Sequence, residues 1–290
     1  MIRLGWAVVV VLFMSTISTK TITTAKALRS TALTAYRRSY EKQGQPDAHQ
    51  VVFASLPIPT PKRVLYPGCY RHITASLCFS HVEYLDCDEK VSDVYKDEIV
   101  CQWVMQQWAR LRSDDGNDKD ERDDKPTWNF TCASFDDSNL FFEEASFDLI
   151  ISLSAGIVST PCLRYLRDDD NGYLLVNDSH GDASAAFVNP QLKLVAVYQG
   201  SNNNDNDNDA GGWTMDTSIL HEYFVTTPQG IPLAPAQAKQ AATIGVKAKR
   251  SYKLAKEAPF YLFQKRARQA VDMATQDGGK VRDKKRQKQS

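Results

Sequence analysis

The chain has 290 residues, enough for one large domain or two small ones, and its 35 basic residues balance 35 acidic ones. The zero net charge hides an uneven distribution, because residues 1–40 and 280–290 are basic whereas residues 41–279 hold 23 basic and 34 acidic residues. An acidic body disfavours nucleic acid as a specific partner, since phosphate contacts need clustered lysines and arginines. Residues 271–290 are predicted to form a basic, disordered tail.

Residues 1–45 have the composition of a targeting segment. An apolar run from Leu4 to Met14 follows Arg3. The run fits the core of a signal peptide but is too short for a membrane span, which needs about 20 residues. The residues that follow are rich in Ser, Thr and Ala and contain no acid before residue 41. This pattern predicts delivery to an organelle, a plastid or a mitochondrion, with the secretory pathway as the alternative. We expect cleavage near residues 15–21 or near Glu41, and no stable membrane span in the mature chain.

Strand and helix patterns alternate within residues 50–270, which we interpret as one domain. Apolar strands are predicted at 63–66, 81–86, 128–133, 147–155, 173–178, 193–199 and 259–266. Helices are predicted at 72–79 and 89–111, and within 156–166 around or after Pro161. Stretches 113–126 and 201–212 are charged or of low complexity and are predicted to be disordered insertions. The alternation predicts an α/β fold with a parallel sheet covered by helices on both faces. The last two strands are connected differently and could form an antiparallel edge pair.

The positions of the cysteines and histidines disfavour disulfide bonds and a metal-binding site. The six cysteines are dispersed without a C-x-x-C pair, and the five histidines never occur at ligand spacing. We therefore expect neither a disulfide framework nor a metal site.

The ends of the predicted strands supply a candidate site, because ligands of open parallel sheets bind beyond the carboxyl ends of the strands. Gly68 follows the first strand, where the lack of a Cβ would let the backbone approach a ligand. Asp86 ends the second strand and could accept both hydroxyls of a ribose, although an ordinary turn residue is the alternative. Ser134 and Phe135 follow the third strand and could contact an adenine edge and face.

Five segments, taken together, resemble the class I S-adenosylmethionine-dependent methyltransferases. They are VLYPGC, VEYLDCD, CASFDD, SFDLIISLSAG and GYLLVND, which span about residues 63–199, with a looser likeness to residue 266. The resemblance implies a Rossmann-like, seven-stranded, mostly parallel sheet whose last strand is antiparallel. It also implies S-adenosylmethionine as the cofactor, without a metal. The implied cofactor-binding residues are Tyr66, Gly68 and Cys69 at the amino-acid end, Asp86 at the ribose, Ser134 and Phe135 at the adenine, and Ser152. Ser154 and Asn177, together with Ser152, would face the methyl acceptor.

The sequence departs from the family in the turn that follows the first strand. The family pattern G-x-G-x-G becomes Gly68, Tyr70 and His72, so that two side chains stand where the backbone usually approaches the cofactor. The Asn-Pro-Pro-Tyr signature of members that methylate amino nitrogen is replaced by SLSAG, which disfavours that class of acceptor.

His180, between Ser179 and Gly181, is the candidate general base, because a histidine titrates near neutral pH. A loop histidine bonded to nearby backbone is the alternative. The sequence thus predicts a methyltransferase-like protein acting on a small molecule, or a non-catalytic binding or assembly protein that retains the fold. A nicotinamide-dependent oxidoreductase is disfavoured, since its G-x-G-x-x-G turn does not occur here.

Overall fold

The computed structural model describes residues 30–41, 47–113, 125–200, 213–238 and 252–267. The predicted signal-peptide run, the predicted tail, the insertion at 201–212 and most of the insertion at 113–126 lie outside the described residues. Among the described helices, none combines the length and the apolarity that a membrane span requires.

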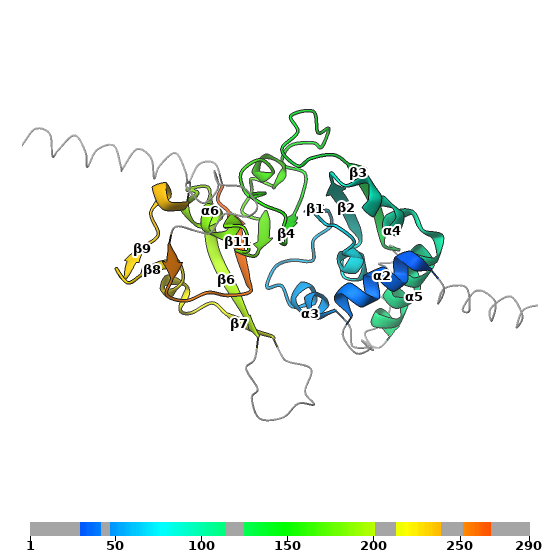
Figure 1. The fold of residues 1–290 in the computed structure, drawn as a ribbon, viewed down its shortest axis with the longest axis horizontal. Helices are drawn as coiled ribbons and strands as arrows, with labels where there is room; N and C mark the ends of the chain where they lie inside the picture. The colour runs from blue at the N-terminus through cyan, green and yellow to red at the C-terminus, as the bar shows by residue number, and fades with distance from the viewer. Residues whose placement is uncertain (1–29, 42–46, 114–124, 201–212, 239–251, 268–290) are drawn as a thin grey trace, which may run out of the picture.

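The centre of the fold is an eight-stranded mixed sheet with the order β3-β2-β1-β4-β5-β11-β6-β7 (Figure 1). The strands are β1 (Val64–Pro67), β2 (His81–Asp86), β3 (Thr127–Cys132), β4 (Leu149–Ser152), β5 (Tyr173–Val176), β6 (Leu192–Gly200), β7 (Trp213–Asp216) and β11 (Phe260–Lys265). The first five run parallel, and the last, β11, is antiparallel to both β5 and β6. The predicted α/β class is confirmed, with one strand more than the seven expected.

The antiparallel pair β6 and β11 forms as predicted but does not lie at the edge. β11 inserts between β5 and β6, and β7 pairs with the outer side of β6. The prediction missed β7 because its four residues follow directly on the low-complexity stretch 201–212 and are too few for their apolar–polar alternation to indicate a strand.

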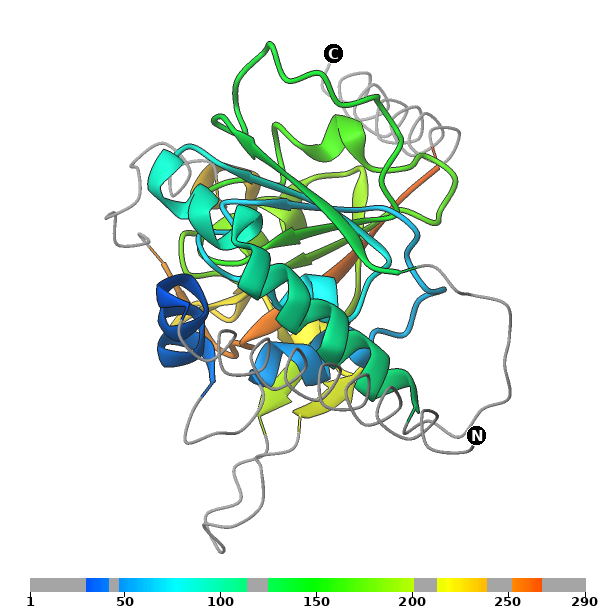
Figure 2. The same ribbon diagram turned by 90° about the vertical axis from the view of Figure 1, so that its right-hand side faces the viewer.

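Helices cover both faces of the sheet, as expected. The first face carries α2 (Thr31–Tyr40), α3 (Ala48–Ala54), α4 (Ser92–Lys96), α5 (Glu98–Ser113) and the 3-10 helices η1 (Ile73–Leu77) and η2 (Glu89–Val91). Figure 2 shows α5 crossing this face. The second face carries α6 (Asp182–Val188), the 3-10 helices η3 (Leu163–Tyr165) and η4 (Leu220–Glu222), and a small sheet of β8 (Val225–Thr227), β9 (Ile231–Pro232) and β10 (Lys253–Leu254).

The central strands are apolar throughout because both of their faces are buried. In β1, Val64 and Tyr66 pack into the core of the first face, whereas Leu65 packs into that of the second. Every residue of β1 and β4 is buried. This is the arrangement that makes a parallel strand appear as a continuous apolar run rather than an alternating one.

Three predicted helices differ in detail from the structure. Residues 72–79 contain the short 3-10 helix η1, and residues 89–111 are divided at Asp97 between α4 and α5. In residues 156–166, which we expect to be helical around or after Pro161, the helical part is only the short 3-10 helix η3 after Pro161. A residue distant in the sequence stabilises that segment instead, because the backbone N–H of Ser159 donates a hydrogen bond to the side chain of Asp182 at 2.9 Å.

Helix α2 packs into the core although it lies within the predicted targeting segment 1–45. Leu33 and Tyr36 are buried, and the Tyr36 hydroxyl lies 2.9 Å from Thr74 Oγ1 of η1. Cleavage near Glu41 would therefore remove part of the core.

Candidate functional site

The carboxyl ends of the five parallel strands lie along one edge of the sheet. Pro67 is paired with Leu85, Asp86 with Cys132, and Ser152 with Val176, so each strand ends level with its neighbour. The loops that begin at residues 68, 87, 133, 153 and 177 therefore leave the sheet on the same side. This is the edge at which the sequence placed its candidate residues.

The turn after β1 is built around Gly68. Its φ is +61°, a left-handed conformation that favours glycine, and its N–H donates to the carbonyl of Leu85 at 2.7 Å. A Cβ at this position would lie 2.2 Å from the Cβ of Ala155, in the loop after β4. A packing reason for the glycine thus exists beside the predicted ligand-approach reason.

Tyr70 and Asp86 complete this turn. Tyr70 also has a positive φ, +47°, and its ring is half exposed. Its N–H donates to Asp86 Oδ2 at 2.8 Å, and Asp86 Oδ1 accepts from the N–H of Asp88 at 2.9 Å. Asp86 therefore does have the role of a turn residue. A carboxylate offers about four lone-pair sites, however, and the bonds seen here occupy one on each oxygen. Asp86 is only half-buried, so acceptor capacity remains.

The loops after β3 and β4 contact each other. Ser134 Oγ donates to Asp136 Oδ1 at 2.5 Å, and Phe135 packs against the core of the second face. A Cβ on Gly156 would lie 3.6 Å from Cζ of Phe135, so the ring lies over that glycine. Both predicted adenine contacts are half-buried at the predicted edge, and their role stays a prediction.

Ser152 at the end of β4 is directed into the fold. Its side chain is buried, and its hydroxyl donates to Asp182 Oδ2 at 2.6 Å. Burial raises the pKa of Asp182 above its usual value, against the hydrogen bonds from Ser152 and Ser159 that lower it. The hydroxyl of Ser152 makes an internal contact between β4 and α6, and the role of Ser152 toward a cofactor or an acceptor stays a prediction.

Tyr66 and Cys69 also have buried side chains. Their side chains are 2% and 1% exposed, so neither lines an open surface. Burial raises the pKa of the Cys69 thiol well above its usual range, which keeps the sulfur protonated. Only the backbone of these two residues could meet a ligand.

Ser154 and Asn177 tie the loops after β4 and β5 together. The Ser154 N–H donates to Asn177 Oδ1 at 3.0 Å, and Asn177 Nδ2 donates to Ser154 Oγ at 3.0 Å. Ser154 is exposed and has a φ of +61°. The pair lies on the predicted edge with accessible polar atoms, and its role toward an acceptor stays a prediction.

His180 is half-buried and has no hydrogen-bond or ion-pair partner within the described part of the chain. Of its two acidic neighbours, Asp178 accepts from the N–H and the hydroxyl of Ser184 at the start of α6, and Asp182 is turned to Ser152. Neither carboxylate orients the imidazole in this structure. The role of His180 as a base therefore stays a prediction without a positioning partner.

A cluster that sequence reasoning missed lies behind the turn, where α3 contacts η1. Asp47 is buried and begins α3. Its Oδ1 lies 2.7 Å from His49 Nδ1, and its Oδ2 lies 2.5 Å from His72 Nε2 and 2.5 Å from Thr74 Oγ1. The hydroxyl of Tyr66 lies 2.6 Å from His72 Nδ1, on the other side of the ring. The D-x-H spacing at 47–49 was the one local signal for this cluster.

Burial and hydrogen bonding together set the charges of His72 and Asp47 in this cluster. Burial lowers the pKa of His72, more than Asp47 raises it, so the ring is neutral near pH 7. Burial pushes the pKa of Asp47 upward, but hydrogen bonds from His49 and His72 outweigh it and hold this pKa well below its usual value. The cluster therefore contains an ionised carboxylate beside a neutral imidazole.

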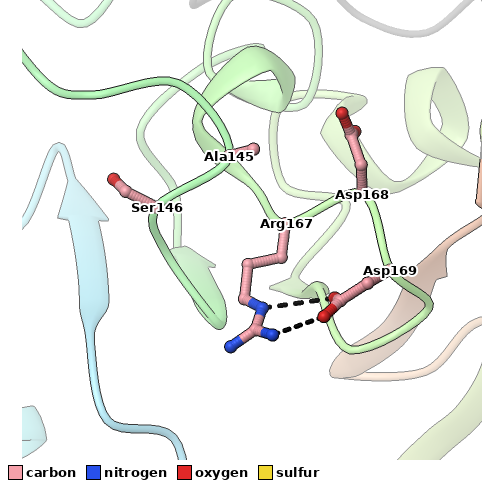
Figure 3. A pocket seen from close by; sticks show the side chains of 5 residues that line it. All are labelled: Ala145, Ser146, Arg167, Asp168 and Asp169. Carbon is pink, nitrogen blue, oxygen red and sulfur yellow. Dashed lines mark hydrogen bonds and ion pairs between the residues drawn. The ribbon is translucent and has the colours of Figure 1, made fainter.

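A shallow pocket of about 400 Å³ lies away from this edge, before the amino ends of β4 and β5 (Figure 3). Ala145, Ser146, Arg167, Asp168 and Asp169 line it. The guanidinium of Arg167 is paired with Asp169 and, at 3.0 Å, with Asp148, so its charge is already matched. The pocket lies at the wrong end of the strands for a ligand of the predicted kind.

No family model matches this chain, and no curated protein matches it in sequence. Among solved structures, the YcgJ protein from Bacillus subtilis is 15% identical with a TM-score of 0.28, covering 44% of this chain and 49% of its own. A putative methyltransferase from Bacillus halodurans is 14% identical with a TM-score of 0.27, covering 44% and 48%. The N-methyltransferase NodS from Bradyrhizobium japonicum, solved with S-adenosyl-L-homocysteine, is 13% identical with a TM-score of 0.32, covering 52% and 77%.

This chain spans about half the length of the first two of these structures. At such low similarity the likenesses carry no argument about substrate or residues. The assignment of the fold rests on strand order: five parallel strands, followed by an antiparallel last strand inserted between β5 and β6. The chain has a Rossmann-like α/β fold.

Proposed function

We propose that the protein binds S-adenosylmethionine at the carboxyl edge of β1, β2 and β4 and transfers its methyl group to a small molecule. In such a transfer a lone pair of the acceptor bonds to the methyl carbon. The carbon–sulfur bond breaks, S-adenosylhomocysteine leaves, and the acceptor proton passes to a base or to water. The acidic body of the chain disfavours a nucleic-acid acceptor.

The observation that carries this proposal is the geometry of Asp86. Its carboxylate lies at the end of β2, directly beside the turn that begins at Gly68, and each of its oxygens accepts a single backbone N–H. The two remaining acceptor positions match the two hydroxyl donors of a ribose in number. The exposed ring of Tyr70 borders the same turn and offers an apolar surface to a base.

The contact between Gly68 and Ala155 favours a second candidate, a non-catalytic protein that retains the fold. The Ala155 methyl group occupies the space next to the glycine, and the side chains of Tyr66, Cys69 and Ser152 are buried. In a non-catalytic protein, the carboxyl edge of the sheet would be a packed surface without a ligand. Asp86 would then only stabilise the turn that it bonds.

Calorimetry with S-adenosylmethionine and S-adenosylhomocysteine separates the two candidates. The wild-type chain should bind both saturably. Asp86→Asn should weaken binding about 10- to 100-fold, because a hydrogen bond to a charged group contributes about 1.5–3 kcal/mol. Glu98→Gln is the matched control. Glu98 is an acidic residue at the start of α5, and its side chain accepts a hydrogen bond from Gln102 of the same helix.

Circular dichroism of both variants would show whether the turn survives the change at Asp86. Failure of the wild-type chain to bind either nucleoside at millimolar concentration would favour the non-catalytic protein. If the wild-type chain binds the cofactor and a folded Asp86→Asn variant binds it equally well, the protein binds the cofactor but Asp86 does not contribute to the site.

A further inference from the structure

The three side chains Asp47, His49 and His72 bring two imidazole nitrogens and a carboxylate together behind the β1 turn. Their ligand atoms all lie within 4.8 Å of one another. Two imidazoles and one carboxylate form the donor set of catalytic zinc sites and of several other divalent transition-metal sites. The side chains of Asp47 and His72 are only 3% exposed, whereas that of His49 is 28% exposed and gives a path to solvent.

A proton or a metal ion must lie between each imidazole nitrogen and the carboxylate oxygen that faces it. A nitrogen lone pair facing a carboxylate oxygen at 2.5 Å or 2.7 Å is repulsive unless a proton or a metal ion bridges the two atoms. The protonated form is a hydrogen-bonded network. In the metal-bound form the ring protons would move to the far nitrogens, and His72 would donate its Nδ1–H to the hydroxyl of Tyr66, 2.6 Å away.

The surroundings of the cluster are those of a supported metal site. Ligating histidines usually donate their second ring N–H to an oxygen, which fixes the tautomer and the ring orientation. Tyr66 offers that oxygen to His72, and Thr74 Oγ1 holds Asp47 Oδ2 at 2.5 Å. The ring of Tyr40 lies over that of His72 at 4.3 Å between centroids and covers the cluster on one side.

The distances allow an ion after a small adjustment. Ligand atoms about 2.0–2.2 Å from a tetrahedral zinc lie about 3.3–3.6 Å from one another. The two short contacts, 2.5 Å and 2.7 Å, must therefore open by roughly 1 Å, which rotation of the Asp47 carboxylate and of the half-buried His49 ring can supply.

We infer that Asp47, His49 and His72 bind one divalent transition-metal ion, zinc being the best fit, with a water as fourth ligand. The ion clamps α3 to the turn that follows β1, through the residue that stands in place of the third glycine of the pattern. The inference does not depend on the proposed function, because none of the three side chains belongs to the proposed cofactor site.

Zinc titration of the tag-free full-length chain, after chelation and desalting, tests this site. The wild-type chain should bind one equivalent with a Kd below about 1 µM, as structural and catalytic zinc sites do. His49→Ala should weaken binding at least about 100-fold, since it removes a ligand and leaves the backbone cap at Asp47 in place. His221→Gln, an exposed histidine on η4, should bind like the wild type.

The exposed thiols of Cys87 and Cys132 could bind zinc on their own, so the titration is also run with Cys87→Ser and Cys132→Ser combined. This background should retain the site. Cobalt binding to the wild-type chain should give tetrahedral visible bands without thiolate charge transfer, a signature that needs no variant to fold.

Absence of stoichiometric zinc binding in the folded wild-type chain would overturn the inference and leave the cluster as a proton-bridged network. Binding that survives in His49→Ala, or that is lost in the background lacking the two cysteines, would overturn it equally.

Discussion

Replacement of Gly68 by alanine tests whether the glycine of the β1 turn is required by packing. The added Cβ would lie 2.2 Å from the Cβ and 3.0 Å from the Cα of Ala155, and the residue would have to keep a φ of +61°. The left-handed backbone costs an alanine about 1–2 kcal/mol, and overpacking at a rigid neighbour adds about 1–3 kcal/mol. Gly68→Ala should therefore lower the free energy of unfolding by about 2–5 kcal/mol.

Equilibrium unfolding in urea, followed by tryptophan fluorescence and circular dichroism, measures this loss. With a slope of about 2 kcal/mol per molar, the midpoint should fall by about 1–2.5 M. The variant Gly68→Ala with Ala155→Gly removes the clash but not the backbone strain, so it should recover about 1–3 kcal/mol of the loss. Ala155→Gly alone is the control and should cost about 1 kcal/mol or less.

The size of the coupling decides between packing and ligand approach. If the double variant is as unstable as the sum of the two single variants, Ala155 does not press on residue 68, and the packing explanation of the glycine is refuted. The left-handed φ and the approach of a ligand would then be the remaining reasons for the glycine, and if a ligand binds there, a nucleoside added to the wild-type chain should raise its midpoint.

Two further predictions concern the buried carboxylate of Asp182 and helix α2. Because burial raises the pKa of Asp182 in the folded chain above its usual 3.8, the folded state holds a proton that the unfolded state has lost, and stability contributed by this group falls as pH rises above about 4. Urea unfolding at pH 4.5 and pH 7.5 should show the wild type losing stability relative to Asp182→Asn, and a gain would contradict the sign. A chain that begins at residue 42 lacks the buried Leu33 and Tyr36, whose loss costs more than about 5 kcal/mol together, so it should not fold. A chain that begins at residue 22 should unfold like the full-length chain, and a cooperative transition in the shorter one would contradict the packing of α2.

The strands were predictable because the central strands are buried on both faces. An apolar run such as residues 149–152 needs no knowledge of its neighbours to be recognised. The segment 156–166 was not predictable in the same way. Its conformation depends on a hydrogen bond from Ser159 to Asp182, a residue 23 positions further along, and local propensity does not carry that information.

The edge of the candidate site was predictable, but the direction of its side chains was only partly so. Parallel strands that end together bring residues 68, 86, 134, 154 and 177 to one edge, which follows from topology alone. Ser152 follows Ile150 on the same face of β4, so alternation along the strand places its side chain against the second face. What the sequence could not supply was the partner there, since Asp182 reaches Ser152 only once α6 has packed on the sheet.

The cluster behind the turn gives a packing reason for the histidine at the third position of the glycine pattern. His72 stands in place of the third glycine, and its ring is enclosed by Tyr66 of β1, Asp47 of the segment before α3, and Tyr40 of α2. A glycine there would leave the buried carboxylate of Asp47 without one of its hydrogen-bond partners, which costs about 1–3 kcal/mol. The side chain at 72 is thus tied to the N-terminal helices and points into the core, away from the half of the turn formed by Gly68, Tyr70 and Asp86. The departure from the pattern at this position is accounted for by packing, and it removes no atom from the edge where a nucleoside would lie.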